Sequence, residues 1–354
     1  MQGPVLGARS RQWLFPWLLA LAALANLAYP LYQHYDVAHS IDPRSYLRMA
    51  SGRFDSVSVT RRYRVLVPAA AAAVAAPIAS IYARVWPQRP EEQWPLRFAF
   101  YLVNCGLLAA AGACWFRSAR LSGASSAAAA LALLAALSSR WAAYIAGLPL
   151  TDSLYLLVFG LSYYAVKRGK GAGWALVAAL LLGPLAKESF CFLLPWVLWF
   201  GRAALSWPRQ LLALTVGLVA LACVHVCIDS QIHAQAGHSL TNALEHLANI
   251  SYSLQRAASV KGLGELLSIF GLFTLVPFLV LVRQKRKGSA LALQSAFGFS
   301  YADAAFLLVV AVHMLLSGDL GRMGYLAAPV FVAMLSLAFT HWHRTLGPGN
   351  TATA

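Results

Sequence analysis

The residues best suited to chemistry lie in one charged stretch, residues 40–68, which reads SIDPRSYLRMASGRFDSVSVTRRYRVLVP and contains six arginines and two aspartates. A guanidinium group can hold a phosphate through two parallel hydrogen bonds, and it loses less on partial desolvation than an ammonium group does. A nearby carboxylate can act as a general base toward a hydroxyl group. The stretch therefore predicts a site that binds a phosphate and accepts a proton, with Arg61, Arg62 and Arg64 as candidate phosphate ligands. An alternative interpretation is that these arginines only anchor the chain at lipid headgroups.

Asp42 is the candidate base in this stretch. It precedes Pro43, and Asp-Pro is typical of a helix start, with the aspartate as N-cap and the proline as first helical residue. The helix that follows would place Tyr46, Met49 and Arg53 on one broad face. Asp42 is then either a plain capping carboxylate or a general base, and the two roles are compatible because capping fixes the position of the carboxylate.

The rest of the chain has the composition of an integral membrane protein. It has 354 residues, a mean hydropathy of +0.62 and only 11% charged residues, whereas soluble domains carry about 25%. Uncharged stretches of about 18–22 residues recur, each long enough to cross a hydrocarbon core about 30 Å thick. We therefore predict an all-α, polytopic transmembrane fold in which residues 1–354 form a single integral membrane domain. The expected spans are residues 13–31, 95–116, 121–139, 150–166, 172–186, 189–203, 210–228, 264–282, 298–317 and 323–340.

The topology depends on the alanine-rich segment 64–86, which contains Pro68 and Pro77. Alanine is close to neutral for membrane insertion, so this segment is a weaker candidate than its neighbours. If it does not cross, there are about ten spans, and the basic clusters share the side of the N-terminus, as the positive-inside rule requires. These clusters are RSAR (117–120), KRGK (167–170), Arg202 with Arg209, RQKRK (283–287) and HWHR (341–344). We therefore predict that both termini are cytoplasmic and that residues 32–94 form the first extracytoplasmic loop, with 64–86 as an interfacial or re-entrant helix.

This topology brings acidic residues together on the outer side, at the ends of several separate spans. Asp152 begins one span, Lys187-Glu188 lies between two others, and Asp319 precedes Arg322 before the last. Ionisable groups near membrane depth are usually functional, so we expect one polar chamber with Arg322 as a further phosphate ligand. The candidate substrate-binding residues are Tyr46, Asp152, Lys187, Glu188 and Asp319. The alternatives are solvated loop charges and, for Asp319 and Arg322, a local ion pair.

Several short motifs follow one another along the chain. They are Asp-x-x-x-Tyr-x-x-x-Ala (Asp42, Tyr46, Ala50), Tyr-Arg-Val-Leu-x-Pro (63–68), Thr-Asp (151–152), Lys-Glu (187–188) and Gly-Asp-x-x-Arg (318–322). In their order and shared side, they make the chain resemble the GT-C superfamily of integral membrane glycosyltransferases, in the small bacterial form without a large soluble domain. The resemblance implies a polyprenyl-phosphate-linked sugar donor, an outer-face active site in the bacterial inner membrane, and an acidic base in the first outer loop. By position Asp42 matches this base best, and Asp36 is the next candidate.

These residues suit an inverting transfer with one carboxylate. A sugar phosphodiester leaves as a phosphate monoester, which needs charge stabilisation more than a proton, so one base and phosphate-binding arginines would suffice. The scheme requires no cofactor or metal, and we assign no metal ligands, although a divalent metal is left open. The acceptor, a lipid-linked glycan, a polysaccharide or a protein, is left open as well.

Other classes of protein fit less of the sequence. The strongest alternative is a transporter or flippase of a lipid-linked or anionic small solute, but many transporters show repeated halves, and the sequence shows no such repeat. A membrane-bound acyltransferase would need a histidine near a hydroxyl, for which His313 is the candidate, although a lone histidine in an apolar span is more often a packed helix contact. The net charge of +16 is spread over short loops, which indicates contact with membrane lipids and not with nucleic acid.

Overall fold

The computed structural model describes residues 6–87, 93–232, 249–277, 279, 282 and 298–346, and the regular elements among them are all helices. The basic cluster 283–287 lies outside the described residues. In chain order the elements, with 3₁₀-helices labelled η, are α1 (Leu6–His34), η1 (Val37–His39), α2 (Ile41–Ala50), α3 (Val59–Arg62), α4 (Leu66–Val85), α5 (Gln93–Leu121), α6 (Ser126–Leu137), α7 (Arg140–Gly147), α8 (Asp152–Arg168), α9 (Gly173–Ala186), η2 (Glu188–Phe192), α10 (Leu194–Phe200), η3 (Gly201–Ala203), α11 (Trp207–Ile232), α13 (Val260–Leu267), η4 (Gly271–Thr274), α16 (Tyr301–Ser317), α17 (Leu320–Gly324), η5 (Tyr325–Ala327) and α18 (Ala328–Leu346).

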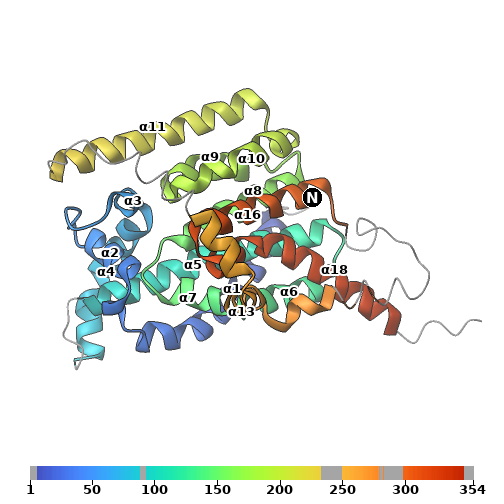
Figure 1. Cartoon of the computed structure of the whole chain (residues 1–354), viewed down its shortest axis with the longest axis horizontal. Coiled ribbons are helices and arrows are strands. Elements are labelled where there is room, and N and C mark those ends of the chain that lie inside the picture. Colours follow the sequence, from blue (N-terminus) through green and yellow to red (C-terminus); the bar gives the residue numbers. More distant parts are fainter. Residues whose placement is uncertain are drawn as a thin grey trace, which may run out of the picture.

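Helices α5 and α18 form the centre of the bundle. α5 packs against α1, α4, α8 and α18, and α11 lies along one side next to α9 (Figure 1). We compare the fraction of buried residues in the apolar stretch of each long helix. This fraction is 67% in α5 and 78% in Leu320–Trp342, which contains most of α18, against 22% in α1, 28% in α4 and 17% in α11. Helices that are apolar on every side yet little buried are typical of a membrane environment. The fold is therefore all-helical, with peripheral helices suited to lipid contact.

The number of helices that could cross a membrane is smaller than the sequence predicts. Among the described residues five helices are long and apolar enough, or up to seven if each of two bent pairs counts as one span. The predicted span 121–139 ends within a 69° bend between α6 and α7, and the predicted span 189–203 consists of the short elements η2, α10 and η3. α9 has 14 residues, which makes it about 21 Å long. The predicted count of about ten is thus not confirmed, because hydropathy does not detect where the helical backbone breaks.

Helix α4 has the length and hydropathy of a membrane span, yet its described neighbours lie at one end of the bundle. Its Ala76 lines a shallow depression together with Ala50 of α2 and Leu96 in the first turn of α5. Near the other end of α4, the hydroxyl of Tyr82 lies 2.7 Å from that of Tyr32 in the last turn of α1. In the chain α2 follows the end of α1, and α5 packs against both of these helices. These contacts favour a helix that stays at this end, and its interfacial placement stays a prediction.

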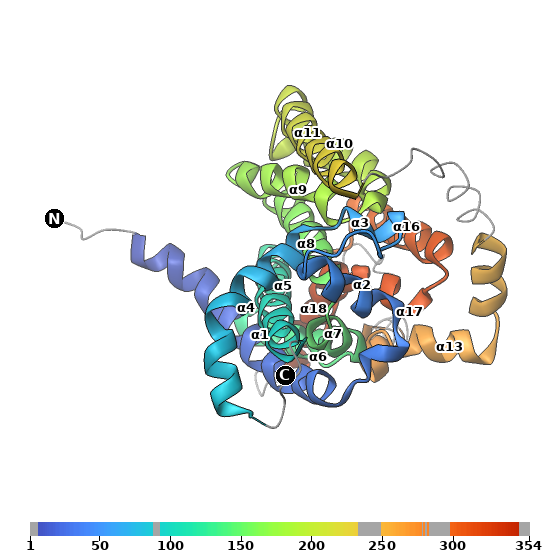
Figure 2. The ribbon, with the colours of Figure 1, turned by 90° about the vertical axis from the view of Figure 1, so that its left-hand side faces the viewer.

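The predicted acidic chamber lies at the opposite end of the bundle from Lys167 and Arg117, which belong to two of the predicted cytoplasmic clusters. Figure 2 shows α2, α3, α7 and α17 together at the end that faces the viewer. At the far end of α8, Lys167 Nζ lies 2.8 Å from the Asp303 carboxylate at the start of α16. Arg117, near the end of α5, donates to Gln12 near the start of α1 at 2.8 Å. The end that holds α2 is called the α2 end below.

We expect cysteines at the two ends of α4 to be labelled from the same side of the membrane. In a cysteine-free background, Ser56→Cys before α4 and Val85→Cys at its end should both react with a membrane-impermeant maleimide in intact cells. Lys170→Cys, at the opposite end of the bundle, should react only after permeabilisation. Reaction of Ser56→Cys and Val85→Cys from opposite sides would show that α4 crosses the membrane.

Candidate functional site

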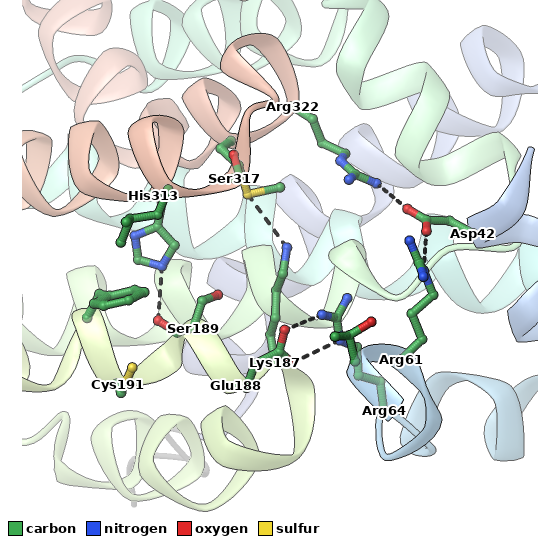
Figure 3. A pocket seen from close by; sticks show the side chains of 14 residues that line it. Asp42, Arg61, Arg64, Lys187, Glu188, Ser189, Cys191, His313, Ser317 and Arg322 are labelled. Carbon is green, nitrogen blue, oxygen red and sulfur yellow. Dashed lines mark hydrogen bonds and ion pairs between the residues drawn. The ribbon is translucent and has the colours of Figure 1, made fainter. Parts of the chain in front are cut away.

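A pocket with a volume of about 530 Å³ lies at the α2 end, where α2, α3, η2, α16 and α17 meet (Figure 3). It is lined by Asp42, Thr60, Arg61, Arg64, Lys187, Glu188, Ser189, Cys191, Phe192, His313, Leu316, Ser317, Arg322 and Met323. The charged side chains lie on one side, and His313, Ser189 and Cys191 lie on the other (Figure 3). The pocket therefore has a charged half and a largely uncharged half.

Asp42 lies between two guanidinium groups from distant segments. Its Oδ1 accepts a hydrogen bond from Nε of Arg61 at the end of α3, and its Oδ2 accepts one from Nη1 of Arg322 in α17 at 3.0 Å. The expected role as N-cap is wrong, because α2 has Ser40 as its N-cap and Asp42 lies within the first helical turn. The position of this carboxylate thus depends on tertiary contacts and not on a local cap.

Arg322 connects Asp42 to two further carboxylates. Its Nη1 lies 3.7 Å from Oδ2 of Asp152 at the start of α8, and its Nε forms an ion pair with Oδ2 of Asp319 at 3.0 Å. Asp319 is also the N-cap of α17, since its Oδ1 accepts a hydrogen bond from the backbone N–H of Arg322 at 3.0 Å. The local pair that the spacing suggested is present, but it belongs to a larger cluster that joins α2, α8 and α17.

Gly321 allows α17 to approach α7 closely. A Cβ at this position would lie 2.1 Å from Cζ2 of Trp141, far inside van der Waals contact. Any side chain at residue 321 would therefore move α17 or the Trp141 ring. Because Arg322 is the next residue, such a movement would also shift its guanidinium relative to Asp42.

Arg64 forms a second set of contacts in the pocket. Its Nε donates to Oε2 of Glu188 at 3.1 Å and its Nη2 donates to Oε1, so the pair is bidentate. Its Nη1 donates to the hydroxyl of Tyr46 at 3.1 Å. Tyr46 is only 1% exposed and does not line the pocket. Its place is therefore behind Arg64, where it orients the guanidinium.

Lys187 and Glu188 enter the pocket because α9 ends just before them. Lys187 has an extended backbone between α9 and η2. Its Nζ lies 3.4 Å from Oδ1 of Asp152 and 3.6 Å from the sulfur of Met323. Asp152 does not line the pocket, so it supports Lys187 and Arg322 from behind.

The neighbouring charges set the protonation of these groups. Burial alone would raise the pKa of the Asp42 carboxyl, but the positive charges of Arg322 and Arg61 outweigh burial and lower that pKa below its ordinary value. The pKa of Glu188 is lowered in the same way, with Arg64 opposing burial. Burial lowers the pKa of Lys187, and the Asp152 carboxylate opposes part of this effect. At neutral pH, Asp42 and Glu188 are therefore ionised.

Positive and negative charges balance in this cluster. The cations are Arg61, Arg64, Lys187 and Arg322, and the anions that pair with them are Asp42, Asp152, Glu188 and Asp319. A partly buried charge without a partner is strongly destabilising, so this pairing is what permits so many charges at one place. Arg61, Arg64 and Arg322, three of the four arginines predicted as phosphate ligands, are thus each engaged by a carboxylate.

Two predicted site residues lie away from the pocket. Arg62 turns back onto its own loop, where Nε and Nη2 donate to the carbonyl of Val57 at 3.1 and 2.9 Å. Asp36 caps η1 by accepting a hydrogen bond from the backbone N–H of Ala38 at 2.8 Å, and its side chain is 63% exposed beside His39. The structure does not bring either residue to Asp42.

Tyr63 holds the loop between α3 and α4 from the side of α11. Its ring stacks on His225 with the centroids 3.4 Å apart, and its hydroxyl donates to Oδ1 of Asp229 at 2.7 Å. Tyr63 therefore points to α11, while Arg61 and Arg64 on either side of it line the pocket. This alternation explains why neighbouring residues of one charged stretch have different partners.

Asn104, a lone amide within the apolar helix α5, supports the start of α8. Its Nδ2 donates to the carbonyls of Leu148 at 2.8 Å and Leu150 at 3.1 Å, and its Oδ1 accepts a hydrogen bond from Ser153. These contacts hold the extended segment before Asp152. The sequence analysis missed Asn104 because it searched for charged motifs. The feature that could have revealed it is an isolated amide within an apolar run.

The uncharged half of the pocket contains residues that the sequence motifs missed, namely Ser189 and Phe192, together with His313. Both ring nitrogens of His313 are engaged, Nδ1 with the carbonyl of Val309 at 2.8 Å and Nε2 with the hydroxyl of Tyr155 at 2.6 Å. No ring nitrogen is thus left to act as a base on a molecule in the pocket. Hydropathy and short motifs cannot pair Tyr155 with a histidine so distant in sequence.

No protein-family model matches the chain, and neither the curated proteins nor the solved structures contain a match. Among the described residues, no three histidine, cysteine, aspartate or glutamate side chains are grouped to hold a metal ion. The fold and the site together define an all-helical protein with apolar helices suited to a membrane and a pocket of paired charges at one end of the bundle.

We expect Asn104→Leu to destabilise the fold, because two buried carbonyls would lose their donor at a cost of about 1–3 kcal/mol each. The measurement is thermal unfolding in detergent, with a lowered Tm. Asn26→Leu is the matched control, since the Asn26 amide donates to the Ala22 carbonyl of its own helix in an exposed position. Equal shifts in Tm for both variants would contradict the supporting role of Asn104.

Proposed function

We propose that the chain is a membrane glycosyltransferase of GT-C type, which moves a sugar from a polyprenyl-phosphate donor to an acceptor hydroxyl on the outer face of the bacterial inner membrane. The observation that supports this most is the position of Asp42, a carboxylate held between Arg61 and Arg322 in the wall of a pocket. Such a transfer needs one carboxylate as base beside groups that can bind a phosphate, and two guanidinium groups can bind one.

Donor binding requires an exchange of partners at Asp42. The cluster has no net charge, so a donor phosphate finds no free guanidinium and must replace a carboxylate as the partner of Arg61 or Arg322. A phosphate oxygen can occupy the position of a carboxylate oxygen on a guanidinium at little cost in geometry. Asp42 is the carboxylate to be replaced, because Asp152 and Asp319 stand behind Arg322 and outside the pocket lining.

Release from the two arginines would make Asp42 a better base. Its lowered pKa depends on the positive charges of Arg322 and Arg61 acting against burial, so loss of these partners would raise the pKa. The acceptor hydroxyl would then give its proton to the Asp42 carboxylate. The acceptor oxygen attacks the anomeric carbon, the bond from that carbon to the phosphate oxygen breaks, and its electron pair leaves with the polyprenyl phosphate. Direct displacement inverts the anomeric centre.

The two halves of the pocket suit an amphipathic donor. Leu316, Phe192 and Met323 offer apolar surface next to the charged groups. A lipid-linked sugar phosphate needs both kinds of surface, whereas a fully hydrated solute needs only the polar one. The acceptor stays open between a lipid-linked glycan, a polysaccharide and a protein.

We expect Asp42→Asn to reduce sugar transfer about 100-fold or more, the loss typical of a missing general base. Transfer is measured with purified protein in liposomes that contain polyprenyl-phosphate hexoses and a membrane extract as source of acceptors. Asp55→Asn is the control, since Asp55 is an exposed acid of the same loop. Full transfer by Asp42→Asn would exclude it as the base, and movement of labelled donor across the bilayer without transfer would favour a flippase.

The structure separates two adjacent arginines that the sequence treats alike. We expect Arg61→Gln to raise the KM for the donor about tenfold or more, because a charge-assisted hydrogen bond to the phosphate contributes about 1.5–3 kcal/mol. Arg62→Gln should leave this KM unchanged, because Arg62 binds the Val57 carbonyl. Equal effects of the two substitutions on KM would contradict the assignment of Arg61 as phosphate ligand.

A further inference from the structure

The uncharged half of the pocket is bordered by a chain of three hydrogen-bonded side chains. Ser189 Oγ donates to the hydroxyl of Tyr155 at 3.2 Å, and this hydroxyl lies 2.6 Å from Nε2 of His313. Nδ1 of His313 lies 2.8 Å from the carbonyl oxygen of Val309. Tyr155 is 1% exposed and His313 is 2% exposed, so both are shielded from bulk water.

The His313 ring faces two backbone carbonyls, and a carbonyl oxygen can only accept a hydrogen bond. Nδ1 lies 2.8 Å from the Val309 carbonyl oxygen and Nε2 lies 3.1 Å from the Ser189 carbonyl oxygen (Figure 3). The shorter contact places the single hydrogen of the neutral ring on Nδ1. His313 lies among the rings of Phe159 and Phe192, and it forms no ion pair with a carboxylate among the described residues. Its neutral form therefore leaves Nε2 as an acceptor. The Tyr155 hydroxyl must then donate to Nε2, which leaves the oxygen of that hydroxyl to accept the proton of Ser189.

Ser189 is consequently a pure acceptor toward the pocket. Its single hydroxyl proton is used on Tyr155, while its oxygen keeps lone pairs and lines the pocket. A group that binds there must donate a hydrogen bond. Phe192 also lines this half and is 37% exposed, so an apolar ring face can pack beside the donating group. A hydroxyl on a carbohydrate ring has both features.

We propose that Ser189, oriented by Tyr155 and His313, accepts a hydrogen bond from one hydroxyl of the transferred sugar and thereby contributes to sugar specificity. This inference rests on the proposed function for the identity of the ligand. The proposal also orients the donor, with its phosphate toward Arg61 and Arg322 and its sugar toward Ser189 (Figure 3). Tyr155 and His313 are positioning residues in this proposal, because they act through Ser189.

The test uses polyprenyl-phosphate hexoses of gluco, manno and galacto configuration, each with its monodeoxy and monodeoxyfluoro analogues. Binding to wild type and to Ser189→Ala is measured by thermal shift in a sugar-free detergent. We expect one deoxy position to weaken binding to wild type about 3- to 10-fold, the worth of a neutral hydrogen bond. Ser189→Ala should bind the parent sugar and that deoxy analogue equally. If Ser189→Ala distinguishes the parent sugar from each deoxy analogue as wild type does, the proposal is overturned.

The fluoro analogues test the direction of the hydrogen bond. Fluorine accepts but cannot donate, so the critical fluoro analogue should bind wild type as weakly as the deoxy one. Tyr155→Phe releases the proton of Ser189, and this variant should recover affinity for the fluoro analogue alone. If wild type binds the fluoro analogue as tightly as the parent sugar, Ser189 is a donor and the inference fails. Ser317→Ala is the matched control, because Ser317 is another serine of the pocket wall and its hydroxyl donates to the Met314 carbonyl.

Alkyl glycosides separate this inference from the proposed donor. They carry the ring hydroxyls and an apolar chain but no phosphate, and the same deoxy series can be made on them. One outcome is that wild type distinguishes parent from deoxy alkyl glycosides, that Ser189→Ala does not, and that polyprenyl-phosphate hexoses do not bind. This outcome would support the hydroxyl site and reject the donor class. Absence of discrimination that depends on Ser189 in both series would reject the hydroxyl site, whatever the outcome of the transfer assays.

Discussion

The guanidinium of Arg322 is the group on which the pocket depends. It pairs with Asp42, Asp152 and Asp319, which belong to three separate parts of the chain. Removal of one partner from a partly buried ion pair leaves an uncompensated charge, which is far more costly than the pair itself. The position of α17, set by its close packing at Gly321, therefore decides where the candidate base lies.

The supporting shell around the charges is made of uncharged polar groups. Asn104 holds the segment before Asp152, and the Tyr46 hydroxyl orients Arg64. Such groups restrict the rotamers of the charged side chains, so that contacts from distant helices meet within hydrogen-bond distance. The pocket thus combines charges that must be paired with polar neighbours that fix which pairs form.

The sequence was sufficient for the helical class and for most of the charged half of the pocket. Asp42, Arg61, Arg64, Lys187, Glu188 and Arg322 could be grouped because a common side of the bundle follows from the order of the helices. Arg62 could not be separated from Arg61, since only the loop conformation sends it to the Val57 carbonyl. Helix α7 after the 69° bend and the division of residues 189–203 into η2, α10 and η3 were missed, because hydropathy does not detect the direction of the backbone.

The electrical neutrality of the cluster has a mechanistic advantage in the proposed transfer. Without donor, Asp42 is ionised and bound to Arg61 and Arg322, so it is a weak base and cannot readily activate water. When a phosphate takes over these guanidinium groups, Asp152 and Asp319 still hold Arg322 in place, and Asp42 alone loses its partners. In the proposed mechanism, base strength would then rise only after the donor is bound. A site with unpaired arginines would bind phosphate more tightly, but it would lack this link between donor binding and proton transfer.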